Sequence, residues 1–162
     1  MTDQTKDRDA QEGIARTSDH YSLQWGKEIN FQAFAEANPE AVRVMPARQL
    51  GWVELFERIR DAARSRPTRV YDAGCGFGDI ARRLFAPPSP PELDYTGADI
   101  HGSLADIDAP PQAKFIRADM ARKLPGDLRF DYVLCRAALH HTPDPAQTYA
   151  TLAAQLAPGG LL

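Results

Sequence analysis

The sequence predicts an α/β protein built on a doubly wound parallel sheet. Two observations support this fold class: short apolar segments alternate with helical or loop segments, and each of these short segments is apolar along nearly its whole length. Strands of a parallel sheet are apolar throughout because helices cover both faces of the sheet. With 162 residues, the chain is long enough for one domain with a substantial core.

The composition narrows the class of protein. The sequence is 43% hydrophobic and 25% charged, with a net charge of -3, which is typical of a globular chain. No apolar run approaches the ~20 residues that span a membrane, and the first residues do not resemble a signal peptide. We therefore predict a cytoplasmic protein without a membrane partner.

The acidic balance of the sequence disfavours a nucleic-acid partner. The two cysteines, Cys75 and Cys135, indicate neither a disulfide framework nor a metal site.

Three segments follow one another along the chain. Residues 1–19 are polar and predict a disordered tail. Residues 20–66 predict a helical cap, which begins with an aromatic-rich stretch and continues as a helix that Pro67 stops. Residues 67–162 hold the α/β core. The cap helix has apolar residues at helical spacing, with charged residues between them: Trp52, Phe56, Ile59 and Ala63.

The sequence of the core segment predicts four strands, at residues 69–74, 94–100, 113–119 and 130–137. A helix begins at Asp79, whose charge suits a helix N-terminus, and the proline-rich stretch 86–93 predicts a loop. A last helix has Asp144 as N-cap, Pro145 at its first position and Gly159 past its end.

Three alternating glycines, Gly74, Gly76 and Gly78, follow the first strand. Ligands of doubly wound sheets lie at the carboxyl ends of the strands, and glycine lets a ligand approach the backbone. Asp99 ends the second strand about 20 residues further on, where a carboxylate can accept the hydroxyls of a ribose. Asp79 stands where a dinucleotide fingerprint has its third glycine, and its charge would repel a pyrophosphate. The turn therefore favours an adenosyl ligand without phosphates.

Five stretches in order resemble one known family. They read "VYDAGCGFGDIA", "TGADI", "FIRADM", "FDYVLCRAALHHTPDP" and "LAPGGLL", and together they are similar to class I S-adenosylmethionine-dependent methyltransferases of the small-molecule type. The resemblance covers about Arg69 to Leu162. It implies a Rossmann-like sheet, S-adenosyl-L-methionine as cofactor, and methyl transfer to a small-molecule acceptor that the motifs do not identify.

The resemblance also implies residue roles. Asp72 and the backbone of the glycine turn would hold the methionine part, Asp119 would accept the adenine amino group, and Met120 would pack on the adenine ring. Arg136 and Ala137 would line the methyl-donor side. The full expected cofactor-binding set is Asp72, Gly74, Cys75, Gly76, Gly78, Asp99, Ile100, Asp119, Met120, Arg136 and Ala137.

His140 and His141 lie where a substrate would enter. Either histidine is a candidate general base, because imidazole titrates near neutral pH. The alternative is a hydrogen bond to backbone at the start of the following helix. Methyl transfer needs a base only where the acceptor must lose a proton.

Alternative functions remain open. An NAD-dependent oxidoreductase is disfavoured by Asp79. Amino-methylation of nucleic acid is disfavoured because "CRAALHH" replaces the Asn/Asp-Pro-Pro-aromatic tetrapeptide of such enzymes. A truncated, non-catalytic cofactor-binding fragment is a third alternative, because "LAPGGLL" leads into the fifth strand in the family and Leu162 is expected to end the chain as that strand begins. On that interpretation the C-terminal strands are missing, residues 130–135 form an exposed edge, turnover is low, and the chain self-associates through that edge.

Overall fold

The computed structural model describes residues 39–100, 104, 107 and 110–162. The predicted tail and the aromatic start of the predicted cap therefore lie outside the described residues. Within them, no helix is long and apolar enough to cross a bilayer. The elements are α3 (Pro39–Ser65), β1 (Thr68–Ala73), α4 (Asp79–Leu84), β2 (Leu93–Asp99), β3 (Ala113–Arg117), β4 (Phe130–Leu134), the short 3-10 helix η2 (Leu139–His141), α5 (Pro145–Ala153) and β5 (Leu156–Leu161).

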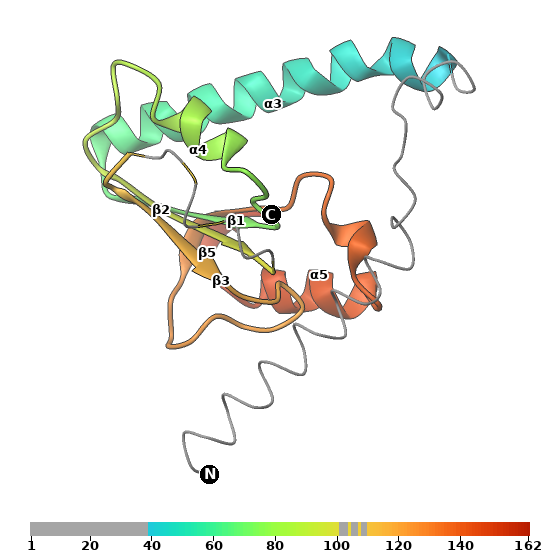
Figure 1. Cartoon of the computed structure of the whole chain (residues 1–162). Helices are drawn as coiled ribbons and strands as arrows, with labels where there is room; N and C mark the ends of the chain where they lie inside the picture. The colour runs from blue at the N-terminus through green and yellow to red at the C-terminus, as the bar shows by residue number, and fades with distance from the viewer. Residues whose placement is uncertain (1–38, 101–103, 105–106, 108–109) are drawn as a thin grey trace.

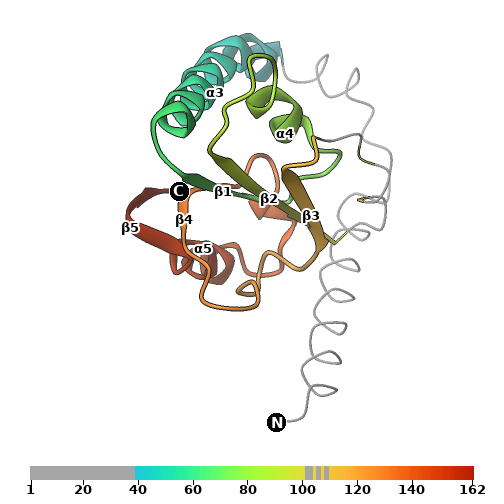
Figure 2. The same ribbon diagram turned by 90° about the vertical axis from the view of Figure 1, so that its left-hand side faces the viewer.

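The strands form one parallel sheet in the order β3-β2-β1-β4-β5. The order of the strands reverses at β1, whose neighbours are β2 and β4, and this is the place where sheets of this kind bind ligands. Helices α3 and α4 lie on one face of the sheet and α5 lies on the other (Figures 1 and 2). The predicted doubly wound α/β fold is therefore confirmed.

Two apolar clusters form the core, one on each face of the sheet. On the α3 and α4 face, three of the predicted apolar positions of α3 are buried with residues of the sheet; this cluster includes Phe56, Ile59, Ala63, Val70, Ile80, Leu84 and Tyr95. On the α5 face the cluster includes Tyr71, Met120, Phe130, Val133 and Leu152. Each large apolar side chain that is fully buried contributes about 1.5–3 kcal/mol, so both faces stabilise the sheet.

The expectation of an exposed fourth strand is wrong. β5 pairs with β4 in parallel, with Phe130 opposite Leu156 and Tyr132 opposite Leu161, and the register shifts between these pairs. Helix α5 ends at Ala153, and Gly159, with φ +78°, lies inside β5 rather than past a helix. Proline and glycine interrupt the apolar run of this strand, so its sequence differs from those of the other strands. The strand bulges at this interruption. The edge that was expected to drive self-association is therefore covered where β5 pairs with it.

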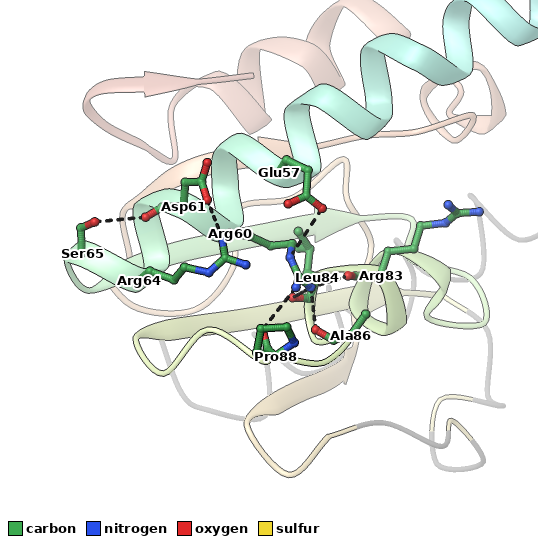
Figure 3. Close-up of polar contacts among 9 residues, drawn as sticks. All are labelled: Glu57, Arg60, Asp61, Arg64, Ser65, Arg83, Leu84, Ala86 and Pro88. Atoms are coloured by element: carbon green, nitrogen blue, oxygen red, sulfur yellow. Dashed lines mark hydrogen bonds and ion pairs between the residues drawn. The ribbon is translucent and has the colours of Figure 1, made fainter.

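A buried arginine joins α3 to α4 and to the proline loop. Arg60 is 5% exposed, although its position among charged residues gives no sign of burial. Its guanidinium donates to the carbonyl oxygens of Arg83 (3.1 Å), Leu84 (3.0 Å), Ala86 (2.7 Å) and Pro88 (3.2 Å), as Figure 3 shows. The last carbonyls of a helix have no partner within the helix and attract positive charge. Arg60 thereby caps α4, the helix that begins directly after the glycine turn.

Candidate functional site

The candidate site lies at the carboxyl ends of β1, β2 and β4. Ala73 is paired with Ala98, and Asp72 with Leu134, so these three strands end at nearly the same level. The glycine turn follows β1, and Asp99 is the last residue of β2. The segment that begins at Cys135 follows β4. The fold therefore brings the main sequence-predicted site residues to one edge of the sheet.

The glycine turn is packed at one end and open in the middle. Gly74, Gly76 and Gly78 have φ values of +75°, +53° and +78°, which glycine adopts far more readily than other residues. A Cβ on Gly74 would lie 2.4 Å from the Cβ of Ala138, whereas a Cβ on Gly76 would meet no atom of the described residues within 4 Å. The open backbone at Gly76 is a cradle in which a ligand can contact the main chain.

Asp99 is bound to the open part of this turn. Its Oδ2 accepts a hydrogen bond from the backbone N–H of Gly76 at 2.9 Å. The next residue, Ile100, accepts a bond on its carbonyl oxygen from Arg117 Nε at 3.0 Å. The half-buried carboxylate of Asp99 is thus held beside the turn by a charge-assisted bond.

Cys75 is a buried packing residue of the turn. Its Sγ lies 3.0 Å from the place that a Cβ on Gly97 would occupy. Burial is the main cause that raises the pKa of the Cys75 thiol, and the nearby carboxylates of Asp72 and Asp99 add to the rise. The thiol is therefore neutral at physiological pH and is not an activated nucleophile.

Asp72 is the most deeply buried acid of the site, with 1% exposure. Its Oδ2 accepts a hydrogen bond from the Tyr95 hydroxyl. Burial raises the pKa of Asp72 to about 7; the bond from Tyr95 opposes the rise, Asp99 adds to it, and Arg136 opposes it. Functional sites often contain a carboxyl group whose pKa is raised toward neutral pH, as it is for Asp72 at this strand end.

Replacing Asp72 should make the stability of the unliganded protein less dependent on pH. Above its ordinary pKa of 3.8 the unfolded chain loses the Asp72 proton, while the folded chain keeps it up to about pH 7. The folded state is therefore favoured most below pH 4, and this contribution is lost as pH rises to 7. The asparagine of Asp72→Asn does not ionise, so this variant lacks the loss. As pH rises from 4 to 8, the free energy of unfolding of the variant should therefore gain on the order of 3–4 kcal/mol relative to that of wild type. Chemical denaturation across this range measures the difference, and parallel pH profiles would contradict it.

Asp119 and Met120 lie on the loop after β3, with 6% and 8% exposure. Asp119 Oδ1 accepts from the N–H of Ala121 at 2.9 Å, so the carboxylate orders its own loop as a turn cap. The Met120 side chain packs beside Gly74, and its sulfur lies 3.9 Å from Cys135 Sγ. The loop after β3 therefore reaches the turn after β1.

The segment after β4 has an unusual backbone. Ala137 has φ +54°, a conformation that is strained for a residue with a Cβ and that often occurs at functional sites. Arg136 and Ala137 are exposed. His140 and His141 lie in η2 with ring centroids 3.9 Å apart; His140 is exposed and His141 is half-buried. In the described part of the chain, no group of three or more His, Cys, Asp or Glu side chains is placed to hold a metal ion.

The sheet order and the site define a Rossmann-like protein with an acidic, glycine-lined ligand edge. Residues 71–162 match the family described as "Methyltransferase domain". Because this match covers more than half of the 162 residues, the chain belongs to that family, among the class I S-adenosylmethionine-dependent methyltransferases.

Named relatives agree with this assignment. Trans-aconitate 2-methyltransferase of Variovorax paradoxus is 37% identical over 132 residues, which are 70% of this chain and 49% of the relative. Ubiquinone biosynthesis O-methyltransferase of Azotobacter vinelandii is 28% identical over 142 residues, 84% of this chain and 54% of the relative. The solved structure of CalS10 from Micromonospora echinaspora, an amino pentose methyltransferase with S-adenosylmethionine bound, is 28% identical with a TM-score of 0.53, over 67% of this chain and 47% of that one. The chain spans about half the length of the curated relatives it matches.

Tyr95 contacts a candidate site residue, Asp72, but is not identified by the sequence motifs. Strand alternation places Tyr95, Gly97 and Asp99 on the same face of β2. This alternation is the one feature of the sequence that links Tyr95 to the predicted site. That signal does not say which residue of β1 lies beside Tyr95. The contact with Asp72 becomes visible only with the register of β1 and β2.

Proposed function

We propose that the chain holds the cofactor-binding part of an S-adenosylmethionine-dependent methyltransferase whose acceptor is a small molecule. The observation that carries the proposal is the bond between Asp99 and the open backbone of Gly76. It places a carboxylate, which can accept ribose hydroxyls, beside a turn against which a ligand can lie. We also propose that the cofactor-binding core begins at residue 67 and that α3 belongs to the cap.

The residues at the edge of the sheet fit this cofactor. Asp72 and the glycine turn would hold the methionine part, Asp99 the ribose, and Asp119 with Met120 the adenine. The cofactor carries a sulfonium cation, and the site offers buried and half-buried carboxylates to it. When bound, the cofactor supplies a methyl group already activated for transfer. The protein then needs mainly to orient the reactants and to exclude water.

A small acceptor is supported by the surroundings of β4. A pocket of about 310 Å³ lies beside the end of β4, and none of the described residues that line it has a charged side chain. The lining includes Trp52 of α3, Cys135 and Leu139. A nucleic-acid groove would instead need a basic surface. Arg136 and Ala137 would line the donor side, and His140 or His141 would act as base only for an acceptor that must lose a proton.

Replacing Asp99 should weaken cofactor binding. Asp99→Ala removes a charged hydrogen-bond acceptor, so we expect an affinity for S-adenosylmethionine that is about 10-fold to 100-fold lower by titration calorimetry. Asp94→Ala is the matched control: it removes an aspartate from the other end of the same strand, where the side chain pairs with Lys114 and Arg69. The control should bind like wild type. Tight binding of NAD without any binding of S-adenosylmethionine would refute the proposal, and methyl transfer to DNA or RNA would refute the small acceptor.

A further inference from the structure

We propose that Tyr95 is a positioning residue of the cofactor site: its hydroxyl sets the orientation and the charge state of the Asp72 carboxylate. This inference rests on the proposed function, because it assumes that Asp72 faces a cationic part of the cofactor. Tyr95 itself lies below the edge of the sheet and acts through Asp72 alone.

The strand register directs Tyr95 toward Asp72. Tyr95 is paired with Val70, and Asp72 is paired with Gly97. Since Gly97 has no side chain, no β2 side chain stands directly beside Asp72. A Cβ on Gly97 would lie 2.9 Å from the ring of Phe115. The Tyr95 ring can therefore reach diagonally along the sheet and donate its hydroxyl hydrogen to Asp72 Oδ2.

Aromatic neighbours hold the Tyr95 ring in this direction. The ring centroid lies 5.8 Å from that of Phe115, at a tilted angle, and 6.2 Å from that of Phe85, edge to face. Tyr95 is fully buried. Packing of this kind fixes the ring before a ligand arrives, so the hydroxyl is preorganised as a donor.

The hydroxyl remains a donor over the physiological range. Burial, followed by the charge of Asp72, raises the pKa of Tyr95 well above its ordinary value, and the backbone of Ala81, in the first turn of α4, only partly opposes the rise. The Tyr95 hydroxyl therefore keeps its proton at neutral pH and donates it in the hydrogen bond to Asp72.

Several other groups face Asp72. Asp99, at the end of β2, disfavours its ionised form, and Arg136, after β4, favours it. The thiols of Cys75 and Cys135 also interact with its charge, as does the Tyr71 hydroxyl from the opposite face of the sheet; all three groups are neutral at pH 7, because burial raises their pKa values. Arg136 is exposed, so solvent screens its charge. A buried hydrogen bond from Tyr95 is therefore the contact that most directly favours ionised Asp72.

The test is the affinity for S-adenosylmethionine as a function of pH, compared between wild type and Tyr95→Phe. Ionised Asp72 attracts the cation, so the wild-type affinity should rise with a midpoint near pH 7. Without the hydroxyl, Asp72 ionises less readily. Tyr95→Phe should bind about 10-fold to 100-fold more weakly at pH 7 and should show a higher midpoint.

Tyr71→Phe is the matched control, because it also removes one fully buried tyrosine hydroxyl from the sheet. Tyr71 lies in the cluster on the opposite face, and its hydroxyl has no hydrogen-bond partner among the described residues. This variant should keep the wild-type midpoint. In the Asp72→Asn background, Tyr95→Phe should cause no further loss of affinity, because the group through which it acts is gone.

The possible failures are distinguishable. Absence of S-adenosylmethionine binding by wild type would overturn the proposed function, and the inference with it. Normal wild-type binding together with an unchanged affinity and midpoint in Tyr95→Phe would overturn the inference alone. If Tyr95→Phe does not fold, NMR of the wild-type protein decides: the Asp72 carboxyl carbon and the Tyr95 hydroxyl proton should titrate together, and independent titration would overturn the inference.

Discussion

Gly74→Ala should lower the free energy of unfolding by about 2–5 kcal/mol. A residue with a Cβ at φ +75° costs about 1–2 kcal/mol. The new Cβ would also lie 2.4 Å from the Cβ of Ala138, which is itself buried. Overpacking of this kind costs about 1–3 kcal/mol. Urea denaturation followed by circular dichroism measures the loss.

Gly76→Ala is the control for the backbone conformation. Its φ is also positive, but a Cβ there would meet nothing within 4 Å in the part of the chain that the structure describes. We expect a loss of only about 1–2 kcal/mol from backbone strain, together with weaker cofactor binding. Ala138→Gly in the Gly74→Ala background should restore part of the stability, because it removes the clashing methyl group. Equal losses in Gly74→Ala and Gly76→Ala would show that the clash with Ala138 is relieved at no cost.

Arg60→Met should destabilise the fold by about 3–5 kcal/mol. The change keeps a long apolar chain but removes the guanidinium, which donates to four carbonyl oxygens on α4 and the proline loop. Those carbonyl oxygens would lose their charged hydrogen-bond donor in a region that is shielded from solvent. Because many domains have only about 5–15 kcal/mol of stability in total, the melting temperature should fall clearly in a thermal scan.

Arg58→Met tests whether the effect belongs to this position. Arg58 lies on the same helix but is exposed, so the free energy of unfolding should change by less than about 0.5 kcal/mol. Arg60→Lys should give an intermediate loss, because an ammonium group cannot reach all four carbonyls with the geometry of a guanidinium. A loss in Arg58→Met as large as in Arg60→Met would contradict a specific role for the cap.

Local signals in the sequence predicted the local structure well. Asp144 caps α5 by accepting from the N–H of Gln147 at 2.9 Å, and Pro145 is the first helical residue, as expected. Caps of this kind depend on residues three positions apart, so a sequence shows them directly. β5 escaped prediction because Pro158 and Gly159 resemble a helix end. That strand exists because the edge of β4 supplies its partner, which is a property of the tertiary structure.

The sequence by itself determined the parallel sheet, the glycine turn after its first strand, and the presence of Asp99 at the end of its second strand. These features follow from apolar patterning and from the conformations that glycine permits, which are local properties. Only the tertiary structure decided that Tyr95 donates to Asp72 and that Arg60 is buried against α4. The partners in each contact are more than 20 residues apart in the chain. Strand register and helix packing set their distance and burial, and no local pattern carries that information.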